Sequence, residues 1–572
     1  MKDEHRVMDP FAATSYRKAL APALLSALGL ALGDMADAVV LGQRMGATGL
    51  AAVSLALPVF MVINLLMHGM GAGGSIRFAR ALGAGHPRTA AENFTQVFTV
   101  TVGCGVVLAL TGSLLLPQLI TLLGAGPAGT PLYAATRRYV QLILLGMPVF
   151  FASYLLNYYL RNDDNQELAG RGSLAGNLAD LALNLVLVLV LDLGVTGAAL
   201  STILGQCVAL VLYLPGLGSR RHFLRFCPAA LRPRELGRSF ALGGSTSVQY
   251  LYQFVFYLLA NRALMAGAGE NGVAIFNVLQ NLSYLVLYLY DGAAKAAQPL
   301  VSTYAAERNV TGSRSTLALA LGTGNGLGIL LCLALSLAAP AVCGVFGLTD
   351  PAAVAAGAAA VRIYCLGLVL GGTNQLLENY DQARGREKRS LLLATLRGAV
   401  VLLPGTALFA LLPVARFWWL FLAVELVSLL LFALLAPRLA PESAVEEDVL
   451  AQTISCTSQD IGSLTRRVQE FCAAHGADTA RQYFAGMAVE EICLAAMEHL
   501  FAHRKDGIVQ VTVVAARDGT IVLHFRDNGT RRDPFSASGA PEQDPGIAVI
   551  RKKAHSFFYR HYQGFNTLTI QI

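Results

Sequence analysis

Charged residues are scarce in this sequence. Asp, Glu, Lys and Arg make up 14% of its 572 residues, whereas about 25% is usual for soluble globular chains. Hydrophobic residues make up 55%, and the mean hydropathy is +0.54. Charge is nearly absent from long stretches between Ala19 and Leu435 and is concentrated after Pro441. The composition argues against a wholly soluble protein and predicts a polytopic membrane protein with a more polar C-terminal region.

Patterns that bind zinc or form a disulfide framework are also missing. The nine cysteines are scattered, form no CxxC pair and are not joined by clustered histidines, so buried thiols are expected. The apolar run behind the charged N-terminus continues through Val40 without a distinct cleavage site. We therefore expect a retained first span and not a signal peptide.

Long apolar runs fill the first three quarters of the chain. A membrane-spanning helix needs roughly 20 apolar residues, and twelve runs reach about that length. They are 19–42, 49–72, 93–117, 137–159, 172–191, 195–216, 239–262, 272–294, 316–340, 354–376, 391–412 and 416–436. Basic residues are concentrated in alternate connections, which predicts that both termini and the C-terminal region lie in the cytoplasm.

The runs form two sets of six. The stretch 48–75 aligns without gaps on 271–298, and the alignment pairs Gly49 with Gly272 and Gly69 with Gly292. Equal spacing at the same place in each set predicts a duplicated six-helix unit, as in many transporters.

Two pairs of polar residues stand out inside the apolar runs of the first half. Asp34 and Asp37 are three residues apart, and Asp180 and Asn184 are four apart, so each pair shares a helix face. A carboxylate at a helix centre costs roughly 2.5 to 3.5 kcal/mol on insertion scales, so such residues usually face a cavity and serve a function. A group that is neutral when protonated and charged otherwise can couple a cation gradient to a conformational change.

Five motifs occur in order in the membrane part: DAVVLGQRMGATGLAAVSLALP (37–58), LRNDDNQELAG (160–170), GVTGAALST (194–202), QPLVS (298–302) and YDQARGREK (380–388). Together they resemble the multidrug and toxic compound extrusion family of secondary antiporters. The resemblance implies two six-helix lobes, a central cavity, and export of organic substrates against inward H⁺ or Na⁺.

The same resemblance implies a cation site in the first lobe. It would contain Asp37, with Asp34 beside it, and the polar pair Asp180 and Asn184. Relatives commonly have Asn first and then Asp or Asn four residues later, whereas this sequence has Asp180 first and then Asn184. This difference in order leaves the choice between H⁺ and Na⁺ open.

Other polar residues in the apolar runs allow two interpretations each. His68 would be either a proton acceptor in a substrate cavity or a hydrogen-bonded interior histidine. Asp291 and Lys295 are four residues apart, so they would form an ion pair or take part in substrate binding. Glu378 is expected to meet water and the basic cluster that follows it. Glu425 lies near Trp418 and Trp419, which mark the membrane interface.

The periodicity changes after residue 450. Alternating residues predict strands at 451–456, 508–515, 519–526, 556–562 and 565–571. Helical patterns cover 459–475, 479–502 and 546–554. The tail is therefore expected to fold as one compact α/β sandwich domain.

Three motifs in the tail carry a second resemblance. VEEICLAAMEH (489–499), DNGTRRDP (527–534) and GIAVIRKKAHSFFYRHYQGFNTLTI (546–570) resemble the N, G1 and G2 boxes of the histidine-kinase-like ATPase fold, closest to anti-sigma-factor serine kinases. The resemblance implies nucleotide-binding roles for Glu491, Asp527, Gly529 and Gly546. Ala495 stands where that family has the Mg²⁺-holding Asn, and a methyl group cannot bind a hard cation. Kinase or ATPase activity is therefore not expected, and ATP binding is left open.

The sequence predicts an α-helical polytopic membrane protein joined to a cytoplasmic α/β domain. Its expected parts are a first lobe (1–218), a basic loop (219–238), a second lobe (239–437), a linker (438–450) and the tail domain (451–572).

We expect an inner-membrane antiporter that exports small organic molecules and uses H⁺ or Na⁺ as the coupling ion. It is expected to need no cofactor or metal and to bind no nucleic acid, and a cytoplasmic regulatory protein would be a partner of the tail. The alternatives are a membrane-anchored signalling protein whose tail binds a sigma factor or an antagonist, and a flippase for a lipid-linked substrate.

Overall fold

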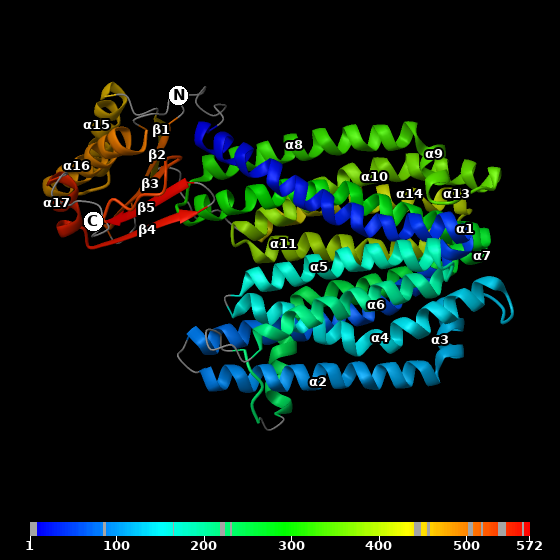
Figure 1. The fold of residues 1–572 in the computed structure, drawn as a ribbon. Coiled ribbons are helices and arrows are strands. Elements are labelled where there is room, and N and C mark those ends of the chain that lie inside the picture. Colours follow the sequence, from blue (N-terminus) through cyan, green and yellow to red (C-terminus); the bar gives the residue numbers. More distant parts are fainter. Residues whose placement is uncertain are drawn as a thin grey trace.

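The computed structural model describes residues 9–83, 87–163, 165–217, 224–228, 232–439, 448–454, 458–501, 507–515, 519–535, 545–562 and 565–572. A bundle of long helices occupies most of the molecule, and a small α/β domain lies at the end of the bundle where the chain begins (Figure 1). In the described ranges, ten helices are long and apolar enough to cross a membrane.

The first lobe begins with one of the two longest helices of the bundle. Its elements are α1 (Pro10–Gly83), α2 (Pro87–Leu114), the short α3 (Leu116–Leu123), α4 (Pro131–Asn162), α5 (Gln166–Asn184) with the π-helical turn η2 (Leu185–Val190), α6 (Gly194–Tyr213) and η3 (Leu214–Gly216).

The second lobe repeats this order. It contains α7 (Pro233–Ala306), α8 (Val310–Leu337), the short α9 (Ala339–Val345), α10 (Pro351–Ala383), α11 (Glu387–Thr395) with the π-helical turn η4 (Leu396–Val400), α12 (Leu402–Phe409), α13 (Val414–Phe417), α14 (Trp419–Leu435) and η5 (Ala436–Arg438).

A glycine divides each of the two longest helices into two spans. Gly46 in α1 has φ 58° and ψ −144°, and Gly269 in α7 has φ 62° and ψ −150°. This backbone conformation is open to glycine and strained for other residues. Each glycine lies two residues before the start of its aligned stretch, 48–75 or 271–298, so both lobes bend at the same place. With each bent helix counted as two spans, the predicted twelve-span architecture is confirmed.

Helix α1 connects the two lobes. Near its start, the Tyr16 hydroxyl lies 2.6 Å from Thr323 Oγ1 on α8 of the second lobe. Further along, Asp37 accepts a hydrogen bond from Asn184 at the end of α5 in the first lobe. The first span therefore contacts the second lobe with one half and the first lobe with the other.

The tail domain is a five-stranded antiparallel sheet with strand order β1-β2-β3-β5-β4. The strands are β1 (Val449–Ile454), β2 (Val509–Ala515), β3 (Ile521–Asp527), β4 (Ser556–Tyr562) and β5 (Phe565–Gln571). The helices are α15 (Ser458–Ala474), α16 (Thr479–Ala495) with the π-helical turn η7 (Ala496–Leu500), and α17 (Pro545–Lys553). All five predicted strands and all three predicted helices are present.

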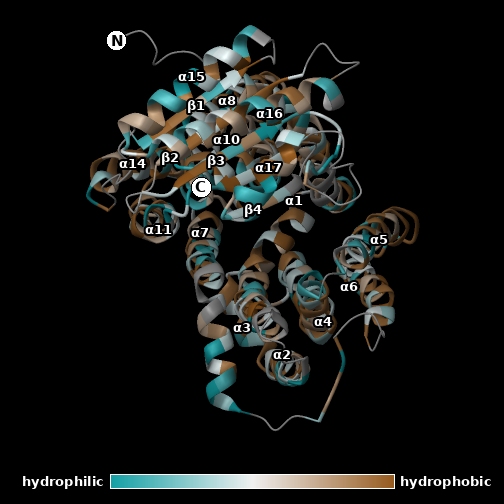
Figure 2. Ribbon diagram, turned by 90° about the vertical axis from the view of Figure 1, so that its left-hand side faces the viewer, coloured by the Kyte–Doolittle hydropathy of each residue, from teal (hydrophilic) through white to brown (hydrophobic). Residues whose placement is uncertain are grey.

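The two faces of this sheet pack against different partners. Leu523 and Phe525 on β3 belong to the apolar core formed with α15 and α16. Side chains alternate along a strand, so His524 and Arg526 point to the opposite face. Figure 2, viewed from the tail side, shows the domain over the lobe that contains α8, α10 and α14, while α2 to α6 lie beside it. The second face of the sheet is therefore directed at the second lobe.

Candidate functional site

Asp37 and Asn184 meet between the first and fifth spans. Asn184 Nδ2 donates a hydrogen bond of 2.7 Å to Asp37 Oδ1. The Asn184 side chain is fully buried, and among the described residues its Oδ1 has no hydrogen-bond partner. The pair therefore places a carboxylate beside an uncommitted amide oxygen, which is a suitable set of ligands for a proton or a small cation.

Asp180 lies one helical turn before Asn184, as the spacing predicts. The buried Tyr139 on α4 is near enough to Asp37 and Asp180 for both charges to act on its hydroxyl. A Cβ atom added at Gly205 on α6 would lie 2.8 Å from Asp180 Cβ, so this glycine permits α6 to pack closely against the acid. Three of the four predicted cation-site residues thus gather in one region, and Tyr139 joins them.

Tyr139 was missed by the sequence analysis. Its position in an apolar run gives no sign of which neighbours it meets, because a tyrosine there is equally typical of ordinary packing. The π-helical turn that starts directly after Asn184 was not predicted either. Turns of this kind are frequent at functional sites because they shift the register of the side chains that follow.

The fourth predicted residue, Asp34, lies in α1, but its side chain is outside the described part of the structure. His68 lies away from the Asp37 region. Its Nδ1 is 2.5 Å from the Tyr158 hydroxyl, and its ring stacks on Tyr250 of α7 at 4.8 Å. These contacts fit an interior histidine that connects the two lobes.

Asp291 and Lys295 form an ion pair. Lys295 Nζ lies 2.5 Å from Asp291 Oδ2, and the lysine side chain is 56% exposed. A pair of this kind within one helix contributes only a few tenths of a kcal/mol, roughly 0.3 to 0.5. The positive charge of Lys295 is therefore compensated locally.

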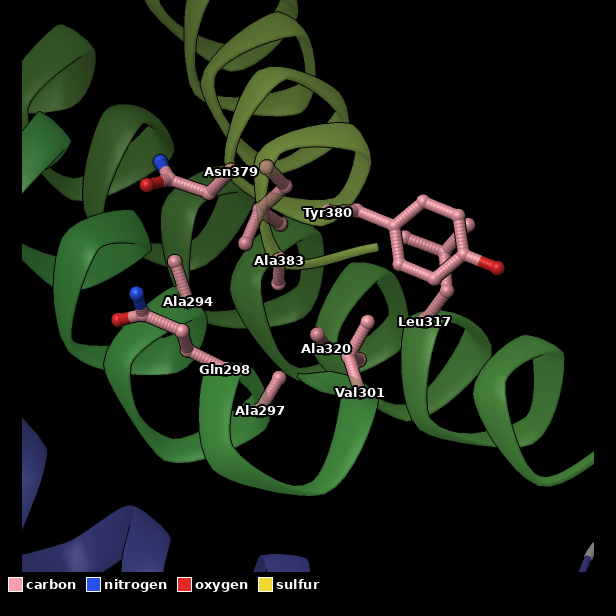
Figure 3. Close-up of a pocket in the computed structure, with 10 residues that line it drawn as sticks. Ala294, Ala297, Gln298, Val301, Leu317, Ala320, Asn379, Tyr380 and Ala383 are labelled. Atoms are coloured by element: carbon pink, nitrogen blue, oxygen red, sulfur yellow. The ribbon is translucent and has the colours of Figure 1, made fainter. Parts of the chain in front are cut away.

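Two cavities are present in the described helices. The larger has a volume of about 370 Å³ and an apolar lining. It is formed by α1, α2, α3 and α4 together with Phe254 of α7, and Thr111 and Gln118 are its polar lining residues. The smaller, of only about 10 Å³, lies between α7, α8 and α10, with the amides of Gln298 and Asn379 at its edge (Figure 3). His68, Asp291 and Lys295 are not among the residues that line these two cavities.

The residues implied for nucleotide binding are engaged within the tail domain. Asp527 Oδ1 accepts hydrogen bonds of 2.8 Å from the Gly529 backbone and from Asn566 Nδ2. A Cβ atom added at Gly546 would lie 2.2 Å from the Glu491 carboxylate, so an acid packs against the start of α17 where a phosphate would be expected. A carboxylate at this place repels a phosphate. The described residues therefore fit a nucleotide poorly.

The polar face of the sheet carries a buried ion pair with the membrane part. Arg526 of β3 forms a salt bridge with Glu307, which follows α7 directly. The Arg526 side chain is 2% exposed and that of Glu307 is 3% exposed. The guanidinium also lies over the ring of Tyr304 at 4.5 Å, and His524 Nδ1 is 3.8 Å from the Glu307 carboxylate.

Asp9, at the start of α1, is held by the same face of the sheet. Its carboxylate accepts hydrogen bonds from Gln510 Nε2 at 2.5 Å, Tyr304 at 3.1 Å and Thr453 at 3.2 Å. Gln510 in turn accepts a hydrogen bond of 3.1 Å from Arg526. One connected network therefore joins α1, α7 and the tail domain.

Apolar packing continues across this contact. The rings of Phe11 and Phe565 meet edge to face at 5.8 Å, and Phe565 belongs to the core cluster of the membrane part. We call the contact formed by Asp9, Phe11, Tyr304 and Glu307 with the sheet the docking interface. The docking interface was not predicted from the sequence, because alternating polar residues on a strand usually indicate an exposed face.

Comparisons with known families match both parts of the chain. The MatE family profile matches residues 22–186 and 243–408. The profile of the histidine kinase-like ATPase domain matches residues 454–572.

Characterised relatives and solved structures agree with these matches. The chain is 26% identical over 213 residues to the probable multidrug resistance protein YoeA of Bacillus subtilis, a match that covers 36% of this chain and 45% of that protein. It is 23% identical over 404 residues to the multidrug export protein MepA of Staphylococcus saprophyticus, covering 69% of this chain and 88% of that one.

Among solved structures, the inward-facing conformation of a multidrug resistance MATE family transporter superposes with a TM-score of 0.64 at 23% identity, covering 74% of this chain and 100% of that chain. The outward-facing conformation of a MATE family transporter gives 0.56 at 22% identity, with 75% and 96% coverage.

Proposed function

This chain belongs to the MatE family, and we propose that it exports small organic molecules in exchange for H⁺ or Na⁺, under the control of its C-terminal domain. The relatives named as multidrug export and resistance proteins support the export activity. The single observation that carries the coupling is the hydrogen-bonded pair of Asp37 and Asn184, with Asp180 one turn away.

The coupling step follows from charge. With no cation bound, Asp37 carries a negative charge at a half-buried position inside the membrane part, which is costly. A proton or a sodium ion at Asp37 removes that charge, and the Asn184 oxygen supplies a second ligand. Because Asp37 lies on the helix that connects the lobes, its occupancy changes the contact between the first span and the first lobe. Alternating access would use this change to favour one side of the membrane.

The larger cavity supports an apolar substrate. Its volume lies within the range of roughly 300 to 1,000 Å³ that is usual for small-molecule sites. The lining is almost entirely apolar, with contributions from α1 to α4 and from Phe254 of the second lobe. A substrate bound there would contact both lobes, so its binding would depend on the distance between them.

The docking interface supports a regulatory role for the tail domain. Asp9 and Asp37 belong to the same continuous part of α1, about 40 Å apart at 1.5 Å per residue. A change in docking would therefore act on the helix that carries the coupling carboxylate. We propose that the docked tail stabilises one position of the first span and that its release alters the transport rate.

The docking interface is expected to weaken in acid. Burial lowers the pKa of His524 below its usual 6.5, nearby Arg526 lowers it further, and the Glu307 carboxylate only partly opposes this. Because the docked state holds neutral His524, it binds fewer protons than the released state, and docking loses stability as the pH falls below about 6.5. Spin labels on the tail and the second lobe should report a smaller docked fraction at low pH.

A His524→Gln variant is the matched test of this pH dependence. The amide can keep a hydrogen bond to Thr569, which lies 3.0 Å from His524 Nδ1, but it does not titrate. The variant should show a flatter pH profile than the wild type. Equal profiles in the two proteins would rule out His524 as the titrating group.

The proposed activity is tested by reconstitution. Full-length protein in vesicles should move an apolar organic cation or neutral dye when a pH gradient or a sodium gradient is imposed separately, and the gradient that drives it identifies the coupling ion. A second protein that ends before the tail domain should show an altered rate under the same gradient. A transport rate that depends on neither gradient would reject the coupling. An equal rate in the full-length protein and in the protein without the tail domain would reject regulation by the tail.

A further inference from the structure

A second charged cluster lies in the membrane part, in the lobe opposite to Asp37. Arg397 Nε lies 2.8 Å from Glu425 Oε2, and Arg397 Nη2 lies 2.9 Å from Glu425 Oε1. The guanidinium and the carboxylate thus make a two-point contact, which is the strongest geometry for such a pair. Arg397 Nη2 also donates to the carbonyl oxygen of Gly371 at 3.2 Å. Arg397 was not among the predicted site residues, although a lone arginine in an apolar run is a visible signal.

Glu378 is the surplus member of this cluster. Its Oε2 lies 3.5 Å from Arg397 Nη1, a distance at the limit of a hydrogen bond. It does not join the basic cluster after α10 as expected; Asp381 contacts Arg386 and Arg389 there. Among the described residues, the charged groups that act on Glu378 are Arg397 and Glu425, and none comes from α7 or α8.

The charges of the cluster do not balance. Two carboxylates face one guanidinium, so one negative charge is left over in an apolar span. A net charge of this kind is expensive in the membrane unless a proton or a cation neutralises it. Both carboxylate oxygens of Glu425 contact Arg397, so the guanidinium already neutralises Glu425. The proton or cation that neutralises the remaining charge would therefore be located at Glu378.

An amide oxygen that has no partner among the described residues lies on the same helix, one turn before Glu378. Asn374 is four residues before Glu378 on α10, so the two side chains share a helix face. Asn374 Nδ2 donates to Glu425 Oε2 at 2.7 Å. Its side chain is fully buried, and its Oδ1 has no hydrogen-bond partner in the part of the chain that the structure describes. The cluster thus repeats the combination of a carboxylate and an uncommitted amide oxygen seen at Asp37 and Asn184.

The two clusters also occupy comparable places in the lobes. Asn184 directly precedes the π-helical turn η2 in the fifth span of the first lobe, and Arg397 lies in η4 in the fifth span of the second lobe. We propose that Glu378 is a second site for a monovalent cation, H⁺ or Na⁺, which Arg397 and Glu425 position and Asn374 completes. The role of this second site in transport rests on the proposed function, whereas the binding of a cation at Glu378 does not.

Chemical labelling tests the site without transport. Dicyclohexylcarbodiimide reacts with a protonated carboxyl group in apolar surroundings, so reconstituted full-length protein should become modified at Glu378, and the modification should decrease as the pH rises. Mass spectrometry of the peptide locates it. Protection by NaCl but not by KCl would identify Na⁺ as the ligand, and dependence on pH alone would identify H⁺. Absence of modification at every pH would overturn the proposal.

The variant Glu425→Gln distinguishes a cation site at Glu378 from a purely structural role of that residue. It leaves one carboxylate for one guanidinium, so Glu378 should become the full partner of Arg397, stay ionised and lose its reactivity. Unchanged labelling in this variant would also overturn the proposal.

Glu378→Gln preserves the pair of Arg397 and Glu425, and in vesicles it should make export depend less steeply on the gradient. If labelling behaves as expected but the wild type shows no gradient-driven export, the proposed function fails and the cation site remains. If export is coupled but labelling is absent, only the second site fails.

Discussion

Arg526→Ala is expected to release the tail domain from the membrane part. The substitution leaves the buried Glu307 carboxylate without its ion-pair partner, and breaking one side of such a pair typically costs about 3 to 5 kcal/mol. That cost corresponds to a change of more than about 100-fold in the docking equilibrium. Distances between spin labels on β4 and on α8 should change from one narrow distribution to a broad one.

Two further proteins separate this effect from general damage to the domain. Arg467→Ala removes an exposed arginine that contacts Gln452 on the tail surface, and docking should be unchanged. The double variant Glu307→Gln with Arg526→Gln removes both charges, so it should release the tail less than the single change does. A tail that stays docked in Arg526→Ala would contradict the importance of the ion pair.

Release of the tail should also alter transport. In the docked state, Asp9 is fixed by Gln510, Tyr304 and Thr453, so the first span starts from a fixed point. Arg526→Ala should change the export rate in the same direction as removal of the tail. If the tail is shown to be released but the export rate equals that of the wild type, the docking interface has only a structural role.

Asp37→Asn is expected to reduce export driven by a cation gradient by roughly 5- to 150-fold, because it removes a coupling free energy of the order of 1 to 3 kcal/mol. Asparagine has nearly the same shape and can still accept the hydrogen bond from Asn184, so the fold should be kept. It cannot change charge, so cation binding can no longer bias the first span. Uptake into vesicles with an imposed gradient measures the loss.

Exchange without a gradient provides the necessary comparison. Asp37→Asn should retain exchange of labelled for unlabelled substrate, which needs only substrate binding and movement of the lobes. Asp192→Asn is the matched control, since Asp192 pairs with Arg44 at an exposed position and such pairs contribute little, about 0 to 1 kcal/mol. Full gradient-driven export by Asp37→Asn would remove Asp37 from the mechanism.

Local patterns gave the elements of this protein correctly. The length of apolar runs specifies spanning helices because the thickness of the membrane fixes that length. Alternation of residues specified β3 and β5 in the tail, and the spacing of Asp180 and Asn184 specified one helix face. The glycines at 49 and 272 indicated the duplication that the bends at Gly46 and Gly269 confirm. These features depend on neighbours in sequence, so a sequence is sufficient to find them.

Contacts between distant segments could not be obtained in this way. Arg526 and His524 alternate with core residues of β3 like any exposed pair, and only the docked structure shows that they face Glu307. Arg397 and Glu425 are 28 residues apart, and a helix face in an apolar run does not reveal its partner. The sequence determined which groups are charged and on which elements they lie. Only the tertiary structure decided which charges are neutralised by a partner and which are left over, because the free energy of a buried charge depends on what surrounds it in space.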